Sequence, residues 1–358
     1  LIAYQGVVAG AGILGLMFGP PALYCIVAYP EFGITVLLLM AYLLFFIGRL
    51  GVNFPLGTVM DGIQGMLILG FFIHQKTRPD WKVFKGPISV MILIWIGFNL
   101  IQVANPSAES RLAWVYTIRA VAIVMLTYFV FMYQIRTVSF LRFLLKLWLG
   151  LALFAALYAY KQEYIGFSAA EDAWLNSEGV ADLLFIAGRW RKFSIFSDPV
   201  AFSYNMVVSS IICIALLTFV KKIWQKIVLV LMLVLFFSSM LFSGTRGAYV
   251  LIPAAMVLFV ILRINRQVLI FSAVGALFFV FLIFVPTTNS NIVRFQTAFK
   301  PNDDISFQAR KNNQKRIQPY ILTHPIGGGL GATGAWGQRF APNSYLANFP
   351  PDSGYVRV

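Results

Sequence analysis

The chain has 358 residues, of which 59% are hydrophobic and only 11% are charged. Soluble domains average about 45–50% apolar and about 25% charged residues, so this composition excludes a soluble globular protein and indicates an integral membrane protein. The formal charge of +15 would suggest nucleic-acid binding in a soluble protein. Here most of the cations flank apolar runs, so they indicate membrane orientation and contact with anionic membrane lipids, and we exclude nucleic acid as a partner.

Apolar runs long enough to form membrane-crossing helices recur along the chain. They predict an all-α polytopic membrane protein with about ten or more transmembrane helices and a large extracytoplasmic loop. The expected spans are 5–29, 31–49, 56–74, 86–104, 113–133, 138–160, 199–220, 223–242, 247–264 and 267–286.

Two long polar segments interrupt the spans. We therefore expect N-terminal transmembrane helices over 1–160, an extracytoplasmic loop over 161–198, transmembrane helices over 199–286, and a large extracytoplasmic loop over 287–358. Short Lys/Arg-rich loops such as 74–85 and 221–226 are assigned to the cytoplasm, which places both long segments on the outer face. The chain opens with Leu1 and stops inside a polar region, so we expect it to continue beyond both ends.

Two charged residues lie inside expected spans at similar depth, Asp61 and Arg119. Because an unpaired charge in lipid is costly, we expect them to form an ion pair, as a structural element or as part of the floor of a site. Cys25 and Cys213 lie in apolar runs and are expected to be core residues. With two distant histidines and no metal-ligand spacing, the sequence predicts neither a metal site nor a cofactor.

The first polar motif is "GRWRKFSIFSDPVAFSYN" at 188–205. Asp198 followed by Pro199 is typical of the start of a helix. Three cations lie just before it, Arg189, Arg191 and Lys192. They either form an anion site or offset the acidic residues of the same loop. The sequence leaves both interpretations open.

The second motif is "LFSGTRGAYVLIP" at 241–253, where Arg246 stands at the junction of two apolar runs. A lone arginine at such a place is usually a helix-end cation that reaches the membrane interface. Here glycines and hydroxyl side chains surround it, at a turn that opens a helix. This context favours an anion site in which the guanidinium clamps a phosphate.

The third and fourth motifs lie near the end of the chain. Residues 308–322 can form a basic amphipathic helix that carries Arg310, and a position on the membrane surface is the alternative explanation for it. His324 follows and opens a glycine run that lacks the Gly-Lys-Ser/Thr ending of a P-loop. Asp352, in "APNSYLANFPPDSGYVRV", is either a general base or a turn-forming residue.

Taken in order, R-K-F-S-x-F-S-D-P, S-G-T-R-G-A, an arginine-bearing helix and H-P-x-G-G-G-L-G resemble the O-antigen ligase and Wzy-type polymerase superfamily. The resemblance covers roughly residues 185–358. It implies a membrane-embedded C-type glycosyltransferase of the bacterial cytoplasmic (inner) membrane, with its active face extracytoplasmic. Such proteins move glycan from undecaprenyl pyrophosphate to a glycan or glycolipid acceptor, by inversion, without nucleotide sugar or obligatory metal. Carried onto this chain, Arg191 and Arg246 grip the donor pyrophosphate and Arg310 assists.

The general base is where this sequence departs from the pattern it resembles. Ligases usually place a histidine late in the large outer loop, and the stretch 341–358 holds none. The expected catalytic residues are therefore His324 and Asp352. The departure favours a polymerase-like or exopolysaccharide relative over a true ligase.

Two other classes of function stay open at this stage. A transporter of an anionic lipid-linked substrate would need cations along a path through the membrane, whereas the cations here group on one face, with Arg119 the exception. A non-catalytic subunit with membrane-protein partners in a larger assembly is the other alternative, because the late histidine is missing.

Overall fold

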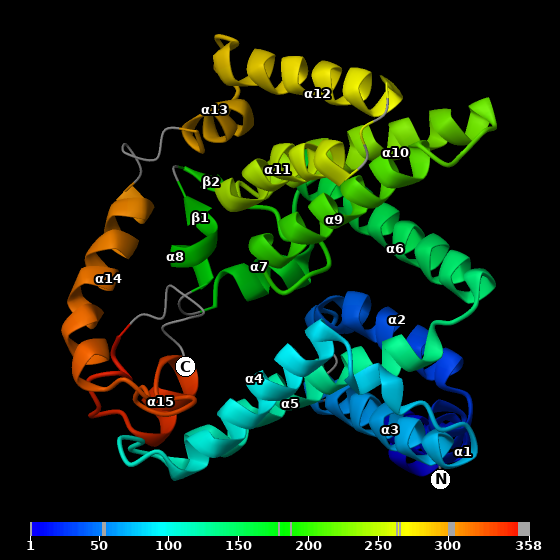
Figure 1. The fold of residues 1–358 in the computed structure, drawn as a ribbon, viewed down its shortest axis with the longest axis vertical. Coiled ribbons are helices and arrows are strands. Elements are labelled where there is room, and N and C mark those ends of the chain that lie inside the picture. Colours follow the sequence, from blue (N-terminus) through cyan, green and yellow to red (C-terminus); the bar gives the residue numbers. More distant parts are fainter. Residues whose placement is uncertain are drawn as a thin grey trace. The chain divides into compact units, whose positions relative to one another are not determined.

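The computed structural model describes residues 2–51, 55–177, 180–186, 188–262, 264, 266–299 and 305–349 (Figure 1). The described chain is almost entirely helical, which confirms the predicted all-α class. The longer helices are α1 (Ile2–Ala28), α2 (Pro30–Arg49), α3 (Leu56–Thr77), α4 (Pro87–Ile101), α5 (Arg111–Gln134), α6 (Val138–Tyr164), α9 (Pro199–Leu217), α10 (Ile223–Phe242), α11 (Arg246–Leu262), α12 (Arg266–Phe284) and α14 (Ile305–Thr323). The shorter elements are 3₁₀ helices η1 (Trp81–Phe84) and η2 (Gln102–Ala104), helices α7 (Ala169–Leu175), α8 (Val180–Leu184), α13 (Ser290–Thr297) and α15 (Gly334–Phe340), and strands β1 (Phe185–Ile186) and β2 (Arg189–Trp190).

Each apolar run predicted from the sequence becomes a helix, from α1 to α6 and from α9 to α12. Within the described residues, seven helices are long and apolar enough to cross a membrane, namely α2, α3, α4 with η2, α5, α6, α9 and α10. Three further apolar segments are shorter, namely Gly15–Ala28, Arg246–Leu262 and Val268–Phe284. A multi-pass membrane protein is therefore confirmed.

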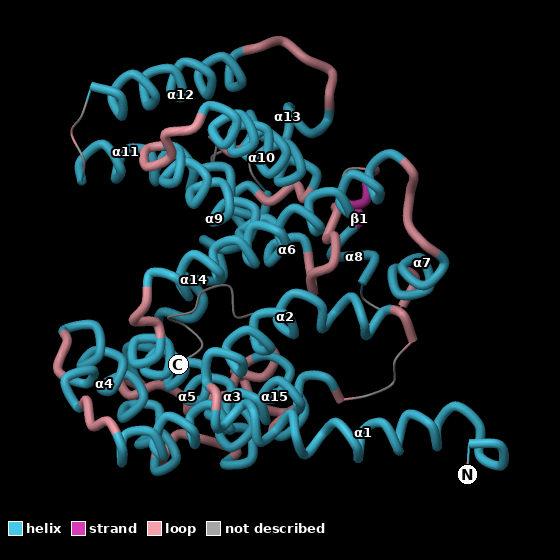
Figure 2. Tube along the Cα trace, turned by 90° about the vertical axis from the view of Figure 1, so that its right-hand side faces the viewer, coloured by secondary structure: helices cyan, strands magenta, loops and turns pink. Residues whose placement is uncertain are grey.

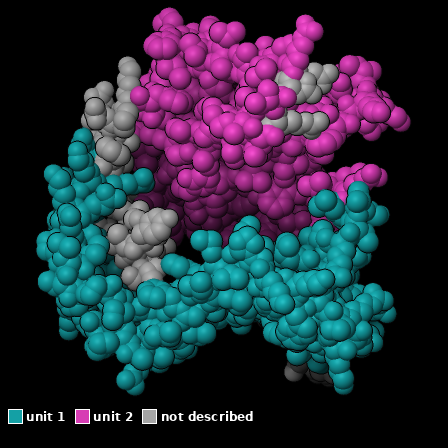
Figure 3. Space-filling model, viewed as in Figure 1, with its two compact units in different colours: residues 1–37, 57–141, 305–358 teal, residues 38–56, 142–304 magenta. Residues whose placement is uncertain are grey.

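The chain forms two compact units, which Figure 3 colours separately. Unit 1 contains Leu1–Leu37, Gly57–Leu141 and Ile305–Val358, and unit 2 contains Leu38–Leu56 and Arg142–Asp304. The four-part division expected from the polar segments follows the order of the chain, whereas these units follow its internal contacts. That four-part division stays a prediction.

Unit 2 is built on α9, which packs against α10 and α11 (Figures 1 and 2). Its core holds large apolar side chains with no exposed surface, including Phe202, Met206, Phe236, Met240 and Tyr249. Helix α6 contributes a fully buried row of alanines at 152, 155, 156 and 159. Small residues at this spacing let helix backbones approach closely inside a membrane. Strand β1 pairs with β2 in a short antiparallel hairpin that leads toward α9.

The start of α9 follows the expected pattern. Asp198 Oδ1 accepts hydrogen bonds from the N–H groups of Val200 at 2.8 Å and Ala201 at 2.9 Å, and Pro199 occupies the first helical position. A side-chain oxygen there accepts hydrogen bonds from N–H groups that the helix itself leaves unpaired. Proline has no N–H group, so at the first helical position it leaves no donor without a partner. The prediction of a helix start at this dipeptide is confirmed.

Unit 1 contains α3, α4, α5 and the C-terminal helices α14 and α15. The intramembrane charges expected to pair lie in this unit, and Arg119 Nη1 is 2.7 Å from Asp61 Oδ2. The glycine run after His324 packs on the turn between α4 and α5. There Gln102 Nε2 donates to the carbonyl of Ile326 and Asn105 Nδ2 donates to that of Gly327, both at 3.0 Å.

Candidate functional site

The motif S-G-T-R-G is the turn between α10 and α11, and Gly244 is its conformational centre. Its φ of +62° lies in the left-handed region, which residues with a Cβ atom rarely adopt. A Cβ at this position would also lie 2.7 Å from Arg294 Nε. Glycine is therefore required twice, once for the turn and once to let an arginine side chain lie against it.

The turn binds two arginine side chains through its own polar groups. Arg191 Nε donates to the Ser243 carbonyl at 2.8 Å, and Arg191 Nη2 donates to Thr245 Oγ1 at 3.0 Å. Arg294 Nε, from α13, donates to the Gly244 carbonyl at 2.7 Å. These bonds hold both guanidinium groups against the turn.

A cavity with a volume of about 230 Å³ opens beside this turn. Arginines from separate parts of unit 2 line it: Arg189, Arg191, Arg246 and Arg294. Its other lining residues are Ile186, Trp190, Phe242, Gly244, Asn291, Val293 and Thr297. We call it the arginine cavity. A concave site with clustered guanidinium groups and an apolar wall suits a phosphate-bearing ligand with an apolar part.

Burial disfavours the charged form of two of these arginines. Burial, with a smaller contribution from the positive charge of Arg294, lowers the pKa of Arg191 to about 10. Burial likewise lowers the pKa of Arg189. At neutral pH Arg191 stays protonated, and a bound anion would relieve the repulsion among the guanidinium groups.

One carboxylate balances part of this charge. Glu163, at the end of α6, forms an ion pair with Arg189 and lies 3.7 Å from Lys192 Nζ. The Lys192 side chain also lies over the ring of Phe167. Burial, with a smaller contribution from the charge of Arg189, lowers the pKa of Lys192 to about 8.

The structure brings together two of the three residues expected to bind pyrophosphate, Arg191 and Arg246. The third, Arg310, is an exposed residue of α14 in unit 1. Sequence reasoning grouped Arg189 with Arg191 in one cation cluster without assigning it to the donor, and it missed Arg294 as a lining residue. For Arg294 the available signal was the short polar helix that follows the last apolar run and carries a single cation.

His324 also lies in unit 1, just after α14. Its ring stacks on that of Tyr320, with centroids 4.1 Å apart and planes 6° from parallel. Its Nδ1 lies 2.9 Å from Thr323 Oγ1 and 3.2 Å from the Tyr320 carbonyl oxygen. Together with residues such as Phe98 and Leu346 it lines a second cavity of about 230 Å³. The other expected catalytic residue, Asp352, lies outside the described residues.

As far as the structure describes the chain, no three His, Cys, Asp or Glu side chains are grouped so that they could hold a metal ion. No curated protein and no solved structure is significantly similar to this chain. Residues 227–357 match the family described as O-antigen ligase (Wzy_C). This stretch includes the S-G-T-R-G turn, Arg294, α14 and the glycine run. This match over residues 227–357 confirms the predicted resemblance to the O-antigen ligase and polymerase superfamily.

Proposed function

We propose that this protein transfers or polymerises glycan from an undecaprenyl-pyrophosphate donor onto an acceptor sugar at the outer face of the bacterial cytoplasmic membrane. The observation that carries the proposal is the arginine cavity. It gathers Arg189, Arg191, Arg246 and Arg294 around one concavity, next to the turn that opens α11. The O-antigen ligase match over 227–357 supports glycan transfer as the class of reaction.

The charge of the cavity suits a diphosphate leaving group. A glycosyl diphosphate ester carries two negative charges, and the diphosphate that leaves carries three. Cations around it therefore stabilise the transition state more than the bound donor, which is the condition for accelerating the chemical step. Because Arg191 and Arg294 are already held by carbonyl groups of the turn, little reorganisation is needed when this charge develops.

In the proposed reaction an acceptor hydroxyl attacks the anomeric carbon of the donor sugar. The new carbon–oxygen bond forms as the bond from that carbon to the diphosphate oxygen breaks, and its electrons leave with the diphosphate. Single displacement inverts the anomeric configuration and needs a base for the hydroxyl proton. His324 and Asp352 remain our candidates for that base.

His324 has a hydrogen-bonding pattern suited to this role. If Nδ1–H donates to the Tyr320 carbonyl, the neutral ring carries its lone pair on Nε2. Nε2 is then the atom that would accept the proton. Arg310 is assigned an assisting role by the resemblance alone, and its exposed position on α14 leaves it accessible to a substrate.

The test is glycan analysis of a deletion strain complemented with the wild type, Arg246→Ala or Arg142→Ala. Arg142 is an exposed arginine of the same unit outside the arginine cavity, so it controls for loss of a cation. We expect Arg246→Ala to abolish polymer at normal protein level. In purified protein we expect it to weaken binding of undecaprenyl pyrophosphate about 10- to 100-fold, the size of one or two charge-assisted hydrogen bonds. Wild-type polymer from Arg246→Ala would overturn the proposal.

The same deletion strain, complemented with variants of His324 and Asp352, identifies the general base. Loss of polymer in His324→Gln with retention in Asp352→Asn identifies the histidine, and the reverse identifies the carboxylate. Undiminished donor binding in the inactive variant would separate a base from a binding residue. Retention of polymer in both variants would exclude both residues.

A further inference from the structure

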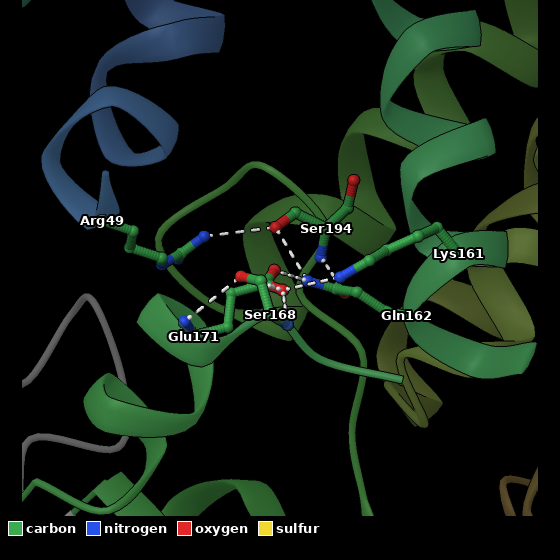
Figure 4. A network of polar contacts seen from close by, with 6 residues as sticks. All are labelled: Arg49, Lys161, Gln162, Ser168, Glu171 and Ser194. Carbon is green, nitrogen blue, oxygen red and sulfur yellow. Dashed lines mark hydrogen bonds and ion pairs between the residues drawn. The ribbon is translucent and has the colours of Figure 1, made fainter. Parts of the chain in front are cut away.

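The last residue of α2, Arg49, contacts the segment that carries Arg191 (Figure 4). Its Nη1 donates to the Ser194 carbonyl at 3.1 Å, and its Nη2 donates to the carbonyls of Phe196 and Ser197. The guanidinium also lies over the rings of Trp174 and Phe193, 4.5 and 4.3 Å from their centroids. One side chain therefore binds three carbonyl groups and two rings.

The segment that Arg49 holds has no regular secondary structure to stabilise it. Ser194 within it has a φ of 54°, which is uncommon for a residue other than glycine. Carbonyl groups of such a segment need partners from side chains when the segment is buried. The planar fork of an arginine presents five N–H donors in a fixed geometry, whereas a lysine presents three on one compact ammonium group.

A second layer holds the same segment from α6 and α7. Gln162 Oε1 accepts from Ser194 N–H at 2.8 Å, and its Nε2 donates to Glu171 Oε1 at 2.5 Å (Figure 4). The carboxylate of Glu171 also accepts from Lys161 at 3.2 Å and from the N–H and hydroxyl of Ser168. Burial alone would raise the pKa of Glu171, but these hydrogen bonds outweigh it and the net shift of the pKa is downward. The carboxylate is therefore ionised at neutral pH and keeps Gln162 oriented.

From Ser194 the chain leads back to the arginine cavity within three residues. The N–H of Lys192 donates to the Phe242 carbonyl at 3.1 Å, and Arg191 reaches Ser243 and Thr245. We propose that Arg49 is a positioning residue for Arg191. Arg49 fixes the 191–198 segment, so that the Arg191 guanidinium contacts the turn between α10 and α11. This inference rests on the proposed function, because it gives Arg49 its effect through the donor-binding arginine.

The inference explains residues of R-K-F-S-x-F-S-D-P that do not line the cavity. Phe193 supplies a ring against which Arg49 lies, Ser194 is held by Gln162, and Asp198 caps α9. The motif thus contains one cavity arginine and the anchors that keep it in place.

The first measurement is hydrogen–deuterium exchange of the full-length protein in detergent, without donor, for peptides covering 189–198. Arg49→Met should raise exchange there by at least about tenfold, since one or more anchoring hydrogen bonds are lost. The matched control is Arg136→Met. Arg136 lies just after α5, has its guanidinium 4.7 Å from the Tyr133 ring centroid, donates to a carbonyl and forms an ion pair with Asp80, but it belongs to unit 1. Unchanged exchange in Arg49→Met, or an equal rise in Arg136→Met, would overturn the inference.

The second measurement is the affinity for undecaprenyl pyrophosphate in detergent micelles. We expect Arg49→Met to weaken it about tenfold, Arg49→Lys to recover part of the loss, and Arg49→Met to add little to Arg191→Ala. Additive losses in the double variant would mean that Arg49 acts independently of Arg191 and would overturn the inference. If Arg49→Met is not recovered folded, Arg49→Lys carries both tests, with smaller changes of the same sign expected.

The two proposals fail separately. A wild type that does not bind undecaprenyl pyrophosphate would overturn the proposed function, whereas a rise in loop exchange specific to Arg49→Met would still support the positioning of Arg191. Donor binding by the wild type with no effect of Arg49→Met on exchange or affinity would overturn only the positioning.

Discussion

Two glycine-containing segments carry the family resemblance, and glycine serves different purposes in them. At 243–247, in unit 2, the missing Cβ of Gly244 admits the Arg294 side chain, and arginines gather at a cavity. At 327–331, in unit 1, the missing Cβ atoms admit backbone and side chains of the same unit, such as Leu346, Ala108 and Thr117. A glycine pattern therefore indicates close approach in both places, and only the neighbours show whether a ligand or another helix approaches.

The second segment is packed without space for larger residues. A Cβ on Gly328 would overlap Leu346 and lie 2.8 Å from the Tyr320 hydroxyl. A Cβ on Gly329 would lie 2.5 Å from that of Ala108. A Cβ on Gly331 would lie 2.6 Å from the Ala113 carbonyl oxygen, on the first turn of α5. This run docks the C-terminal part of unit 1 on the turn between α4 and α5.

The largest expected effect comes from Gly331→Ala, which tests the packing role. The residue has a φ of +83° and faces backbone that cannot move without shifting α5. The left-handed conformation costs about 1–2 kcal/mol with a side chain, and overpacking adds about 1–3 kcal/mol. We expect the free energy of unfolding to fall by about 3 kcal/mol, measured by thermal unfolding in detergent. Donor affinity per folded molecule should stay unchanged, because Gly331 does not line the arginine cavity.

The matched control is Gly65→Ala in α3, where a Cβ meets nothing within 4 Å. Replacing glycine by alanine inside a helix stabilises it by about 0.5–1 kcal/mol. A Gly331→Ala protein as stable as Gly65→Ala, or one with weakened donor binding and normal stability, would contradict the packing interpretation.

The next effect comes from Gly244→Ala, which tests the ligand role. The new methyl group would displace the Arg294 side chain, which can move more easily than backbone. We expect undecaprenyl pyrophosphate to bind about tenfold more weakly, the size of one charge-assisted hydrogen bond, with a loss of stability of about 1–2 kcal/mol. Titration of the purified protein with this lipid measures the affinity.

Gly188→Ala separates the two contributions to that result. Gly188 also has a left-handed backbone, with φ of +75°, but a Cβ there meets nothing within 4 Å. It should therefore lose similar stability and keep its donor affinity. Equal weakening of donor binding in both variants would show that backbone strain, rather than the position of Arg294, governs the affinity.

The same contrast shows what the sequence could predict. Hydropathy predicted the helices because each has a long apolar run, and the Asp198-Pro199 dipeptide predicted the start of α9 from local chemistry. Arg246 was recognised from the glycine and hydroxyl residues around it at a helix start, and Arg191 was assigned to the same site through the family resemblance. Their meeting at one cavity depends on how α9, α10 and α11 pack.

The residues that were missed depend on long-range packing. Arg294 is distant in sequence from Gly244, and no local pattern links α13 to the turn. Arg49 ends an apolar helix and is typical of a membrane-interface cation, so its binding to three carbonyl groups of another segment leaves no mark near it in the sequence. The glycine run showed close approach but not the identity of its neighbour.

The smallest expected effect concerns Lys192, whose amine adds to the charge beside the arginine cavity. Burial lowers its pKa to about 8, whereas a lysine in the unfolded chain has a pKa of about 10.4. Between these values the unfolded chain binds more protons than the folded protein, so the free energy of unfolding should rise with pH in that window. Below pH 8 both states hold the proton and this group adds no slope. We expect a gain on the order of 1 kcal/mol between pH 7.5 and 9.5, measured by thermal unfolding in detergent, and its loss in Lys192→Met. The same rise in both proteins would mean that the Lys192 amine has the same pKa in the folded and unfolded states. The negative charge of Glu163 would then offset the cost of burying the amine.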